Sequence, residues 1–300
     1  LDFLSREYKV LFVVAAGNID NQLGKYPRNH FADPSARIAS PADSILSITV
    51  GSISKYDNTN SLSLKDELSP FSRIGPGADK GVKPELVAHG GNLVRPYKSI
   101  PQLSTHGVSH DAKTLATNIG TSFSAPIISQ NAQRLFDAYP GCHPNLVKAL
   151  LFHFAQGMKI PTGVTNKEIH CTGFGEPRVD GAINAEAHNA VYIPKTLDYK
   201  NKKTKLKVRI TVIYDPKVAE DNPMEYSQVR VALTLQKLAR TGRKFVTFKS
   251  SSSYSIPWSP IIKFEKTFTR SFLTGAWDVR LRMFTRGDIS PTYKQDYALI

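Results

Sequence analysis

The sequence is poor in cysteine and has no long apolar run, and each absence argues against a class of protein. Two of its 300 residues are cysteines, Cys142 and Cys171. That is too few for the disulfide framework that holds small secreted modules together. No stretch of 18 consecutive apolar residues occurs, so no segment is predicted to span a membrane as a helix. Neither a Gly-rich phosphate loop nor the Cys/His spacing of a zinc site is present.

The amino-acid composition is that of an ordinary globular protein. The chain is 41% hydrophobic and 21% charged, and it is long enough for a large core or for two domains. It begins at Leu1, in the segment LDFLSREYKV, which reads as an amphipathic helix entered part-way through a domain. This segment lacks the basic, apolar and small-residue zones of a signal peptide. We therefore expect a fragment with a segment missing upstream, and the sequence assigns no compartment.

Positive charge is concentrated in the last third of the chain. Residues 1–194 contain 18 Lys and Arg against 16 Asp and Glu, a net charge of +2, whereas residues 195–300 contain 21 against 9, a net charge of +12. Such a region could bind nucleic acid or another acidic partner. The preferred interpretation is that basic side chains alternate outward on strands. Nucleic acid is disfavoured because these residues interleave with core-facing aliphatics, not with exposed aromatics.

Two different hydrophobic periods divide the chain. Up to residue 192, short apolar strands alternate with helical patterns after residues 121 and 144, which predicts a parallel sheet flanked by helices. The unbroken apolar run Val10–Val14 is expected to be a strand buried on both faces of that sheet. From residue 193 to 300, alternation with a period of two predicts an antiparallel β-sandwich. The core-facing positions of this second part are predicted to include Leu206, Val208, Ile210, Val212, Tyr214, Val229, Val231, Leu233, Trp277, Val279, Leu281 and Phe284.

Two segments of the first part bring together groups suited to acyl transfer. VVAAGN ends a predicted strand in small residues and Asn18, and the carboxyl end of a strand is where α/β sheets place ligands. NIGTSFSAP places Ser122 just before a predicted helix. Ser and Thr at such a position can serve as helix caps. The alternative is a nucleophile, with the Asn side chain donating its N–H to an oxyanion.

With these segments the sequence resembles the subtilases, the subtilisin-like serine proteases. The resemblance rests on VVAAGN, on GTSFSAP and on KPELVAHGG, supported by weaker matches in the family's order across roughly residues 1–190. It implies a subtilisin-like α/β fold that is incomplete at the N-terminus. The remainder is similar to the jelly-roll-like β-sandwich that follows the catalytic domain in some subtilases.

The resemblance also implies roles for individual residues. Ser122 would attack a peptide carbonyl to form an acyl-enzyme, and Asn18 would donate a hydrogen bond to the oxyanion beside the Ser122 N–H. Substrates would be proteins or peptides. The residues implied in shaping the site and the primary specificity pocket are Gly120, Thr121, Ala15 and Gly17.

The largest departure from the family pattern is a missing base. In subtilases the catalytic Asp and His both precede the oxyanion Asn in chain order. Here no His precedes Asn18; those that follow include His30, His106, His110, His143, His153, His170 and His188. The His106–His110 segment is predicted to be a surface loop. Residues 1–300 alone are therefore not expected to hydrolyse peptides efficiently, and a missing N-terminal segment would carry Asp and His.

Two further residues depart from the family pattern. Ser124 stands where Ala is usual, and His89 where Pro is usual.

No cofactor is expected to be required. Structural calcium is conceivable in this family, but the candidate carboxylates Asp79, Glu85 and Asp180 are scattered and are better explained as solvated or capping groups. Two alternative functions stay open: a pseudoprotease that acts as a binding module, and a basic sandwich that binds an acidic partner.

Overall fold

The computed structural model describes residues 1–300 except 184–204, 223–224, 239–244, 249–255 and 270–276. The chain divides into two compact units, unit 1 within residues 1–183 and unit 2 within residues 184–300. The predicted boundary between residues 192 and 193 lies outside the described residues.

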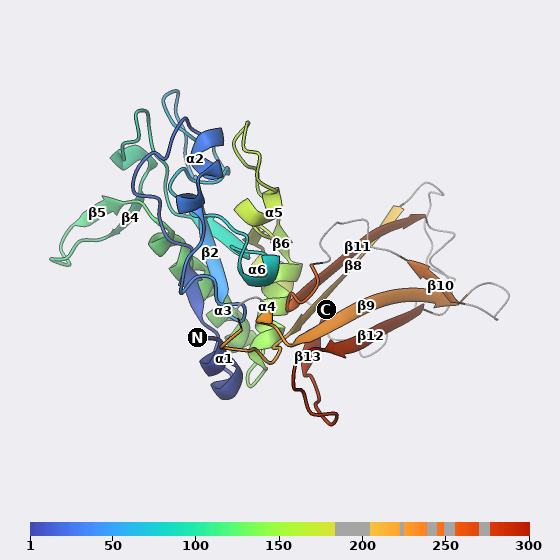
Figure 1. Ribbon diagram of the computed structural model, residues 1–300. Helices are drawn as coiled ribbons and strands as arrows, with labels where there is room; N and C mark the ends of the chain where they lie inside the picture. Colours follow the sequence, from blue (N-terminus) through green and yellow to red (C-terminus); the bar gives the residue numbers. More distant parts are fainter. Residues whose placement is uncertain (184–204, 223–224, 239–244, 249–255, 270–276) are drawn as a thin grey trace. The chain divides into compact units, whose positions relative to one another are not determined.

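Unit 1 is a mixed α/β structure built on a three-stranded parallel sheet of order β1-β2-β3 (Figure 1). Its strands are β1 (Val13–Ala15), β2 (Ile48–Ile53), β3 (Leu86–His89), β4 (Thr105–Val108), β5 (Leu115–Asn118), β6 (Ala155–Gln156) and β7 (Glu176–Pro177). Its helices are α1 (Asp2–Tyr8), α2 (Arg28–Ala32), α3 (Thr121–Ala138), α4 (Pro144–His153), α5 (Glu168–Cys171) and α6 (Val179–Ile183), with 3-10 turns η1 (Pro34–Ala36), η2 (Ala78–Lys80) and η3 (Pro101–Leu103). In the described part of the chain, no helix has the length and apolarity to cross a membrane.

The three parallel strands differ in how deeply they are buried. Every residue of β2 is buried, as expected for a central parallel strand. The residues of β1 are only half-buried, and Val10 is 44% exposed. The prediction that the run Val10–Val14 is buried on both faces is therefore wrong for this structure. The reason is that β1 is an edge strand among the described residues, with β2 as its neighbour on one side.

Helix α3 follows the predicted apolar stripe and covers the sheet. Ala125, Ile128, Ala132 and Leu135 are buried, at the i, i+3, i+4 spacing of one helix face. The helix contacts all three parallel strands, and α4 and α6 pack against it. This packing fixes where the first turn of α3, which carries Ser122, lies relative to the strand ends.

Helix α1 forms as predicted, but it does not bury the apolar face that its sequence favours. Phe3 and Tyr8 are 57% and 66% exposed, while Asp2 and Ser5 are buried. The Asp2 carboxylate accepts hydrogen bonds from the Leu46 N–H at 2.9 Å and from the Ser44 hydroxyl. The orientation of α1 is therefore set by a polar anchor and not by hydrophobic burial.

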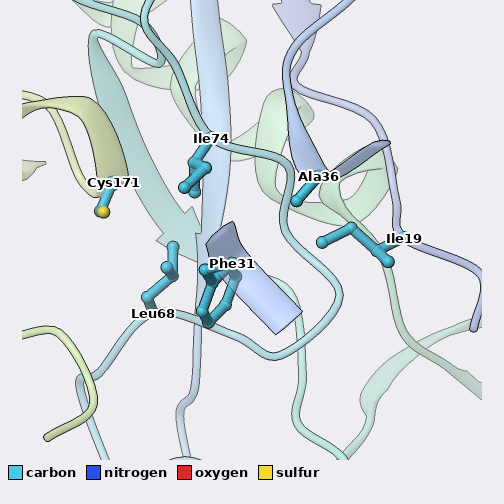
Figure 2. Packing of buried hydrophobic residues seen from close by; sticks show 6 residues of the cluster. All are labelled: Ile19, Phe31, Ala36, Leu68, Ile74 and Cys171. Carbon is cyan, nitrogen blue, oxygen red and sulfur yellow. The ribbon is translucent and has the colours of Figure 1, made fainter. Parts of the chain in front are cut away.

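A buried apolar cluster lies next to the segment that follows β1. Figure 2 shows its six residues, contributed from distant parts of the unit: Ile19, Phe31, Ala36, Leu68, Ile74 and Cys171. Burial raises the pKa of the Cys171 thiol to about 12, so this cysteine behaves as a small apolar core residue. Both cysteines are free. Because Ile19 is in this cluster, the backbone of its neighbour Asn18 is anchored to the core.

His30 is a fully buried histidine with both ring nitrogens engaged. Its Nδ1 accepts from the Leu23 N–H at 3.1 Å, so its Nε2 carries the proton and donates to the Pro70 carbonyl at 2.8 Å. Burial lowers the pKa of His30, and the hydrogen bond to Pro70 opposes that shift. The imidazole is therefore held in its neutral form.

The lowered pKa of His30 predicts that acid destabilises unit 1. The folded state binds this proton less readily than the unfolded chain, so the contribution to stability is fully present above the unfolded pKa of about 6.5 and is lost as the pH falls below it. Urea unfolding followed by far-UV circular dichroism between pH 7.5 and pH 5 should show this decline, and His30→Gln should flatten it. His170, whose pKa burial also lowers, is present in both proteins. An equal pH slope in the two proteins would contradict the prediction.

Lys83 and Glu85 form an ion pair that connects the starts of β2 and β3. Both side chains are 2% exposed, and Lys83 Nζ lies 2.5 Å from Glu85 Oε1. Lys83 also donates to the Ser47 carbonyl and the Thr49 hydroxyl, each at 3.0 Å, while Glu85 accepts from the Thr49 N–H at 2.8 Å. Burial raises the pKa of Glu85, and the Lys83 ammonium opposes that shift. Glu85 is thus neither solvated nor capping, which corrects the interpretation from sequence.

Removing one partner of this pair is expected to destabilise unit 1 strongly. Lys83→Met leaves a buried carboxylate without its counter-ion, which costs about 3–5 kcal/mol of unfolding free energy. The double variant Lys83→Met/Glu85→Gln should recover most of that loss, because Gln is neutral and keeps an acceptor for the Thr49 N–H. Urea denaturation of the four proteins of this cycle measures the coupling. Equal stability of the single and double variants would contradict the assignment.

Unit 2 is all-β. Its strands are β8 (Lys205–Tyr214), β9 (Val229–Leu238), β10 (Phe245–Phe248), β11 (Ile261–Thr269), β12 (Trp277–Thr285) and β13 (Tyr297–Leu299). They form two antiparallel sheets, of order β10-β9-β12 and β11-β8-β13. One apolar cluster joins residues of both sheets, among them Val212, Leu235 and Phe264. The jelly-roll-like sandwich stays a prediction.

Burial in unit 2 agrees with the predicted core positions only in part. Ile210, Val212 and Tyr214 of β8 are buried as predicted, but Thr211 and Ile213 between them are buried as well, so this part of β8 is covered on both faces. Val279 and Phe284 of β12, both predicted to face the core, are 40% and 43% exposed. Phe284 is one residue out of phase with Trp277, Val279 and Leu281, and a shift of one residue places a side chain on the opposite face of the strand.

Candidate active site

The site begins where the chain leaves β1. Gly17 has a φ of +92°, and a Cβ at this position would lie 2.9 Å from Cδ of Arg73. Both the conformation and the contact require glycine. Arg73 holds the segment from the other side, since its N–H donates to the Gly17 carbonyl and its Nε to the Asn18 carbonyl, each at 3.1 Å. The backbone of Asn18 is therefore fixed by contacts on either side.

The Asn18 side chain is clamped by the first residue of α3. Its Oδ1 accepts from the Thr121 N–H at 3.0 Å and from the Thr121 hydroxyl at 3.1 Å. That hydroxyl in turn accepts from the Gly17 N–H at 3.2 Å. Because a backbone N–H can only donate, these bonds identify Oδ1 and turn Nδ2 toward Gly120. A Cβ on Gly120, whose φ is +149°, would lie 3.1 Å from Nδ2.

Ser122 lies beside this clamp, in the first turn of α3. Its side chain is exposed, whereas Thr121 is fully buried. Within the part of the chain that the structure describes, neither its hydroxyl nor its N–H forms a hydrogen bond. The structure thus brings Asn18, Thr121, Gly17 and Gly120 together and leaves the Ser122 side chain exposed beside them.

Two positioning contacts were not found from the sequence. The Gly90 carbonyl, just after β3, accepts from the Gly120 N–H at 2.9 Å, and a Cβ on Gly90 would lie 2.4 Å from the Ser52 hydroxyl. Ser124 is fully buried and donates its hydroxyl to the Ala88 carbonyl at 2.9 Å. In the sequence, the Gly-Gly pair that ends KPELVAHGG could have indicated the contact between Gly90 and Gly120.

The other predicted residues lie apart from the clamp or have other partners. Ala15 is half-buried at the end of β1 and pairs with Val50. Asp180 is exposed and forms an ion pair with Arg134 at 2.8 Å. In the described ranges there is no group of three or more His, Cys, Asp or Glu side chains that could hold a metal ion. The calcium prediction stays unassigned.

None of the described histidines forms a hydrogen bond with Ser122. His106 and His110 are exposed, as predicted, but they belong to an antiparallel hairpin of β4 and β5 and not to an irregular loop. His89 lies 3.6 Å from Glu176 and 3.9 Å from Asp66. His188 lies outside the described residues.

The subtilase family model matches residues 3–187, more than half of the chain. The chain belongs to the subtilase family. This subtilase is 29% identical over 266 residues to the uncharacterized protein y4bN of Sinorhizobium fredii (strain NBRC 101917 / NGR234). That alignment covers 73% of this chain and 62% of the relative, so the chain spans less than two thirds of the relative's length.

Solved structures similar to this subtilase include three proteases. One is the epidermin leader peptide processing serine protease of Staphylococcus aureus, with a TM-score of 0.41 and 19% identity over 62% of this chain and 43% of that one. Another is the prenylagaramide maturation protease PagA, with a TM-score of 0.38 and 19% identity over 60% and 52%. A protease of Pseudoalteromonas arctica gives a TM-score of 0.41 and 17% identity over 61% and 44%.

Proposed function

We propose that this chain carries the nucleophile and the oxyanion hole of a subtilisin-type serine endopeptidase. The observation that carries the proposal is the Asn18–Thr121 clamp beside an exposed Ser122. The clamp occupies Oδ1 of Asn18 and leaves its N–H groups as donors. Proteins or peptides are the corresponding substrates, and Ala15, Gly17, Thr121 and Gly120 are the proposed substrate-contacting residues.

The chemistry follows from where these groups lie. The Ser122 oxygen bonds to the substrate's carbonyl carbon while its proton passes to a base. Asn18 Nδ2 and the Ser122 N–H donate to the oxyanion that forms. The α3 N-terminus also favours that negative charge. The base returns its proton to the leaving amine, and an acyl ester remains on Ser122. Water then attacks the ester carbonyl while the same base accepts a proton from it. The base returns that proton to the Ser122 oxygen as the acyl group leaves as a carboxylic acid.

We propose that the base and its orienting carboxylate come from outside residues 1–300. Ser122 is exposed, and in the described residues no His is bonded to it. In the family's chain order, Asp and His precede the oxyanion Asn. A serine without a base is a weak nucleophile at neutral pH, so this chain alone should react slowly.

An active-site probe tests the proposal. A fluorophosphonate should modify Ser122 in the gene product that includes the coding sequence ahead of Leu1, and peptide mass spectrometry should place the adduct on that residue. Ser122→Ala should abolish the adduct. Ser124→Ala is the matched control, because it removes a neighbouring hydroxyl that is buried and already bonded. A folded gene product without an adduct would instead favour the pseudoprotease that acts as a binding module.

A further inference from the structure

The outer strand of one sheet in unit 2 has an uncovered edge. Strand β12 pairs with β9 along its whole length, from Trp277↔Lys237 to Thr285↔Val229. In the described part of unit 2, no strand pairs with its other edge. Val279 and Met283, on the face that carries the core residue Leu281, are 40% and 41% exposed. An edge strand that is nine residues long and partly apolar can pair with another extended chain.

The opposite face of β12 carries two arginines and one acidic residue, Asp278. Arg280, Arg282 and Phe284 alternate with the apolar residues and are all exposed. Arg280 donates to Asp278 at 2.5 Å, while Arg282 has no ion-pair partner among the described residues. On the neighbouring strand β9, the Arg230 guanidinium lies 5.5 Å from the centre of the Phe284 ring. This face belongs to a region of the sequence with a net charge of +12.

The same charges argue against pairing with a second copy of the chain. If two β12 strands paired antiparallel about Leu281, Arg280 of each would lie opposite Arg282 of the other. Like charges directly opposite each other on neighbouring strands are destabilising. The edge is therefore suited to a chain of the opposite charge.

We propose that β12 binds an extended peptide segment in which acidic residues alternate with apolar ones. The peptide would add to the free edge as a further antiparallel strand, with its backbone completing the hydrogen-bond ladder. Its Asp or Glu side chains would lie beside Arg280 and Arg282 on one face, and its apolar side chains beside Val279 and Met283 on the other. This site is independent of Ser122, so it holds whether or not the chain takes part in proteolysis.

A binding titration with the full 300-residue chain tests this proposal. The probe is a fluorescein-labelled peptide of four Glu-Val repeats, followed by fluorescence anisotropy. Two matched peptides serve as controls: four Lys-Val repeats reverse the charge, and N-methylation of alternate residues of the Glu-Val peptide removes the ladder donors. We expect binding of the Glu-Val peptide and at least a tenfold weaker affinity for either control.

Charge-reversal variants locate the site. Arg282→Glu should weaken binding about tenfold, and Arg282→Gln should weaken it less. Lys294→Glu makes the same charge change at an exposed position outside β12 and should alter binding by less than twofold. Far-UV circular dichroism confirms that each variant is folded. Equal effects of Arg282→Glu and Lys294→Glu, undiminished binding of the N-methylated peptide, or stronger binding of single-stranded DNA of equal charge would each overturn the proposal.

Discussion

Ser122→Ala is expected to lower kcat for peptide hydrolysis by the proposed endopeptidase about 10⁶-fold, the loss measured when the nucleophile of subtilisin, another member of the family, is removed. No other hydroxyl in the described site can replace it. The Thr121 hydroxyl is buried between Asn18 and Gly17, and the Ser124 hydroxyl is bonded to the Ala88 carbonyl. Stability should stay within about 0.5 kcal/mol, because the Ser122 side chain is exposed and unbonded.

Steady-state hydrolysis of a fluorogenic peptide library, with unfolding measured in parallel, separates these two expectations. Ser124→Ala installs the residue that the family usually has, and it should keep kcat within about tenfold. Retention of activity by Ser122→Ala would show that another residue is the nucleophile. A large loss of stability in the same variant would show that Ser122 has a structural role instead.

Asn18→Asp is expected to lower kcat about 10²–10³-fold with little change in KM, a range that comes from the oxyanion Asn of subtilisin itself. The substitution removes the Nδ2 donor and places a negative charge where the oxyanion forms. It keeps an oxygen that can accept from the Thr121 N–H and hydroxyl. The fold should therefore hold while the transition state loses a donor.

Asn18→Ala is expected to affect stability as well as kcat, unlike Asn18→Asp. It removes the acceptor as well as the donor and leaves two Thr121 donors unsatisfied at a fully buried position, which costs about 1–3 kcal/mol of stability. Thr121→Val should lower kcat because it removes one of the two donors that hold Asn18 Oδ1 and leaves the Gly17 N–H without its acceptor, and Thr121→Ser should restore it. If Asn18→Asp hydrolyses peptides at the parent rate, Asn18 does not donate to the oxyanion.

The hydrophobic periods of the sequence determine the local structure and the fold class. The i, i+3, i+4 spacing of Ala125, Ile128 and Ala132 predicts α3 correctly, since one helix face must be buried against a sheet. The alternation of Ile210, Val212 and Tyr214 likewise predicts β8. The segments VVAAGN, GTSFSAP and KPELVAHGG, with weaker matches in the family's order, indicated the family to which the chain belongs.

Only the tertiary structure decided how those segments meet and what covers them. The Asn18–Thr121 clamp joins residues 103 positions apart, and no spacing in the sequence could specify which oxygen or nitrogen of the amide it would engage. The predictions that Phe284 faces the core and that Glu85 is solvated or capping were wrong, and the pattern gave no indication that Asp2 would be buried. Periodicity records how often a residue type recurs on one element. Burial depends on which neighbour covers that element, and a hydrogen bond or counter-ion supplied from elsewhere in the chain can make a polar group the one that is buried.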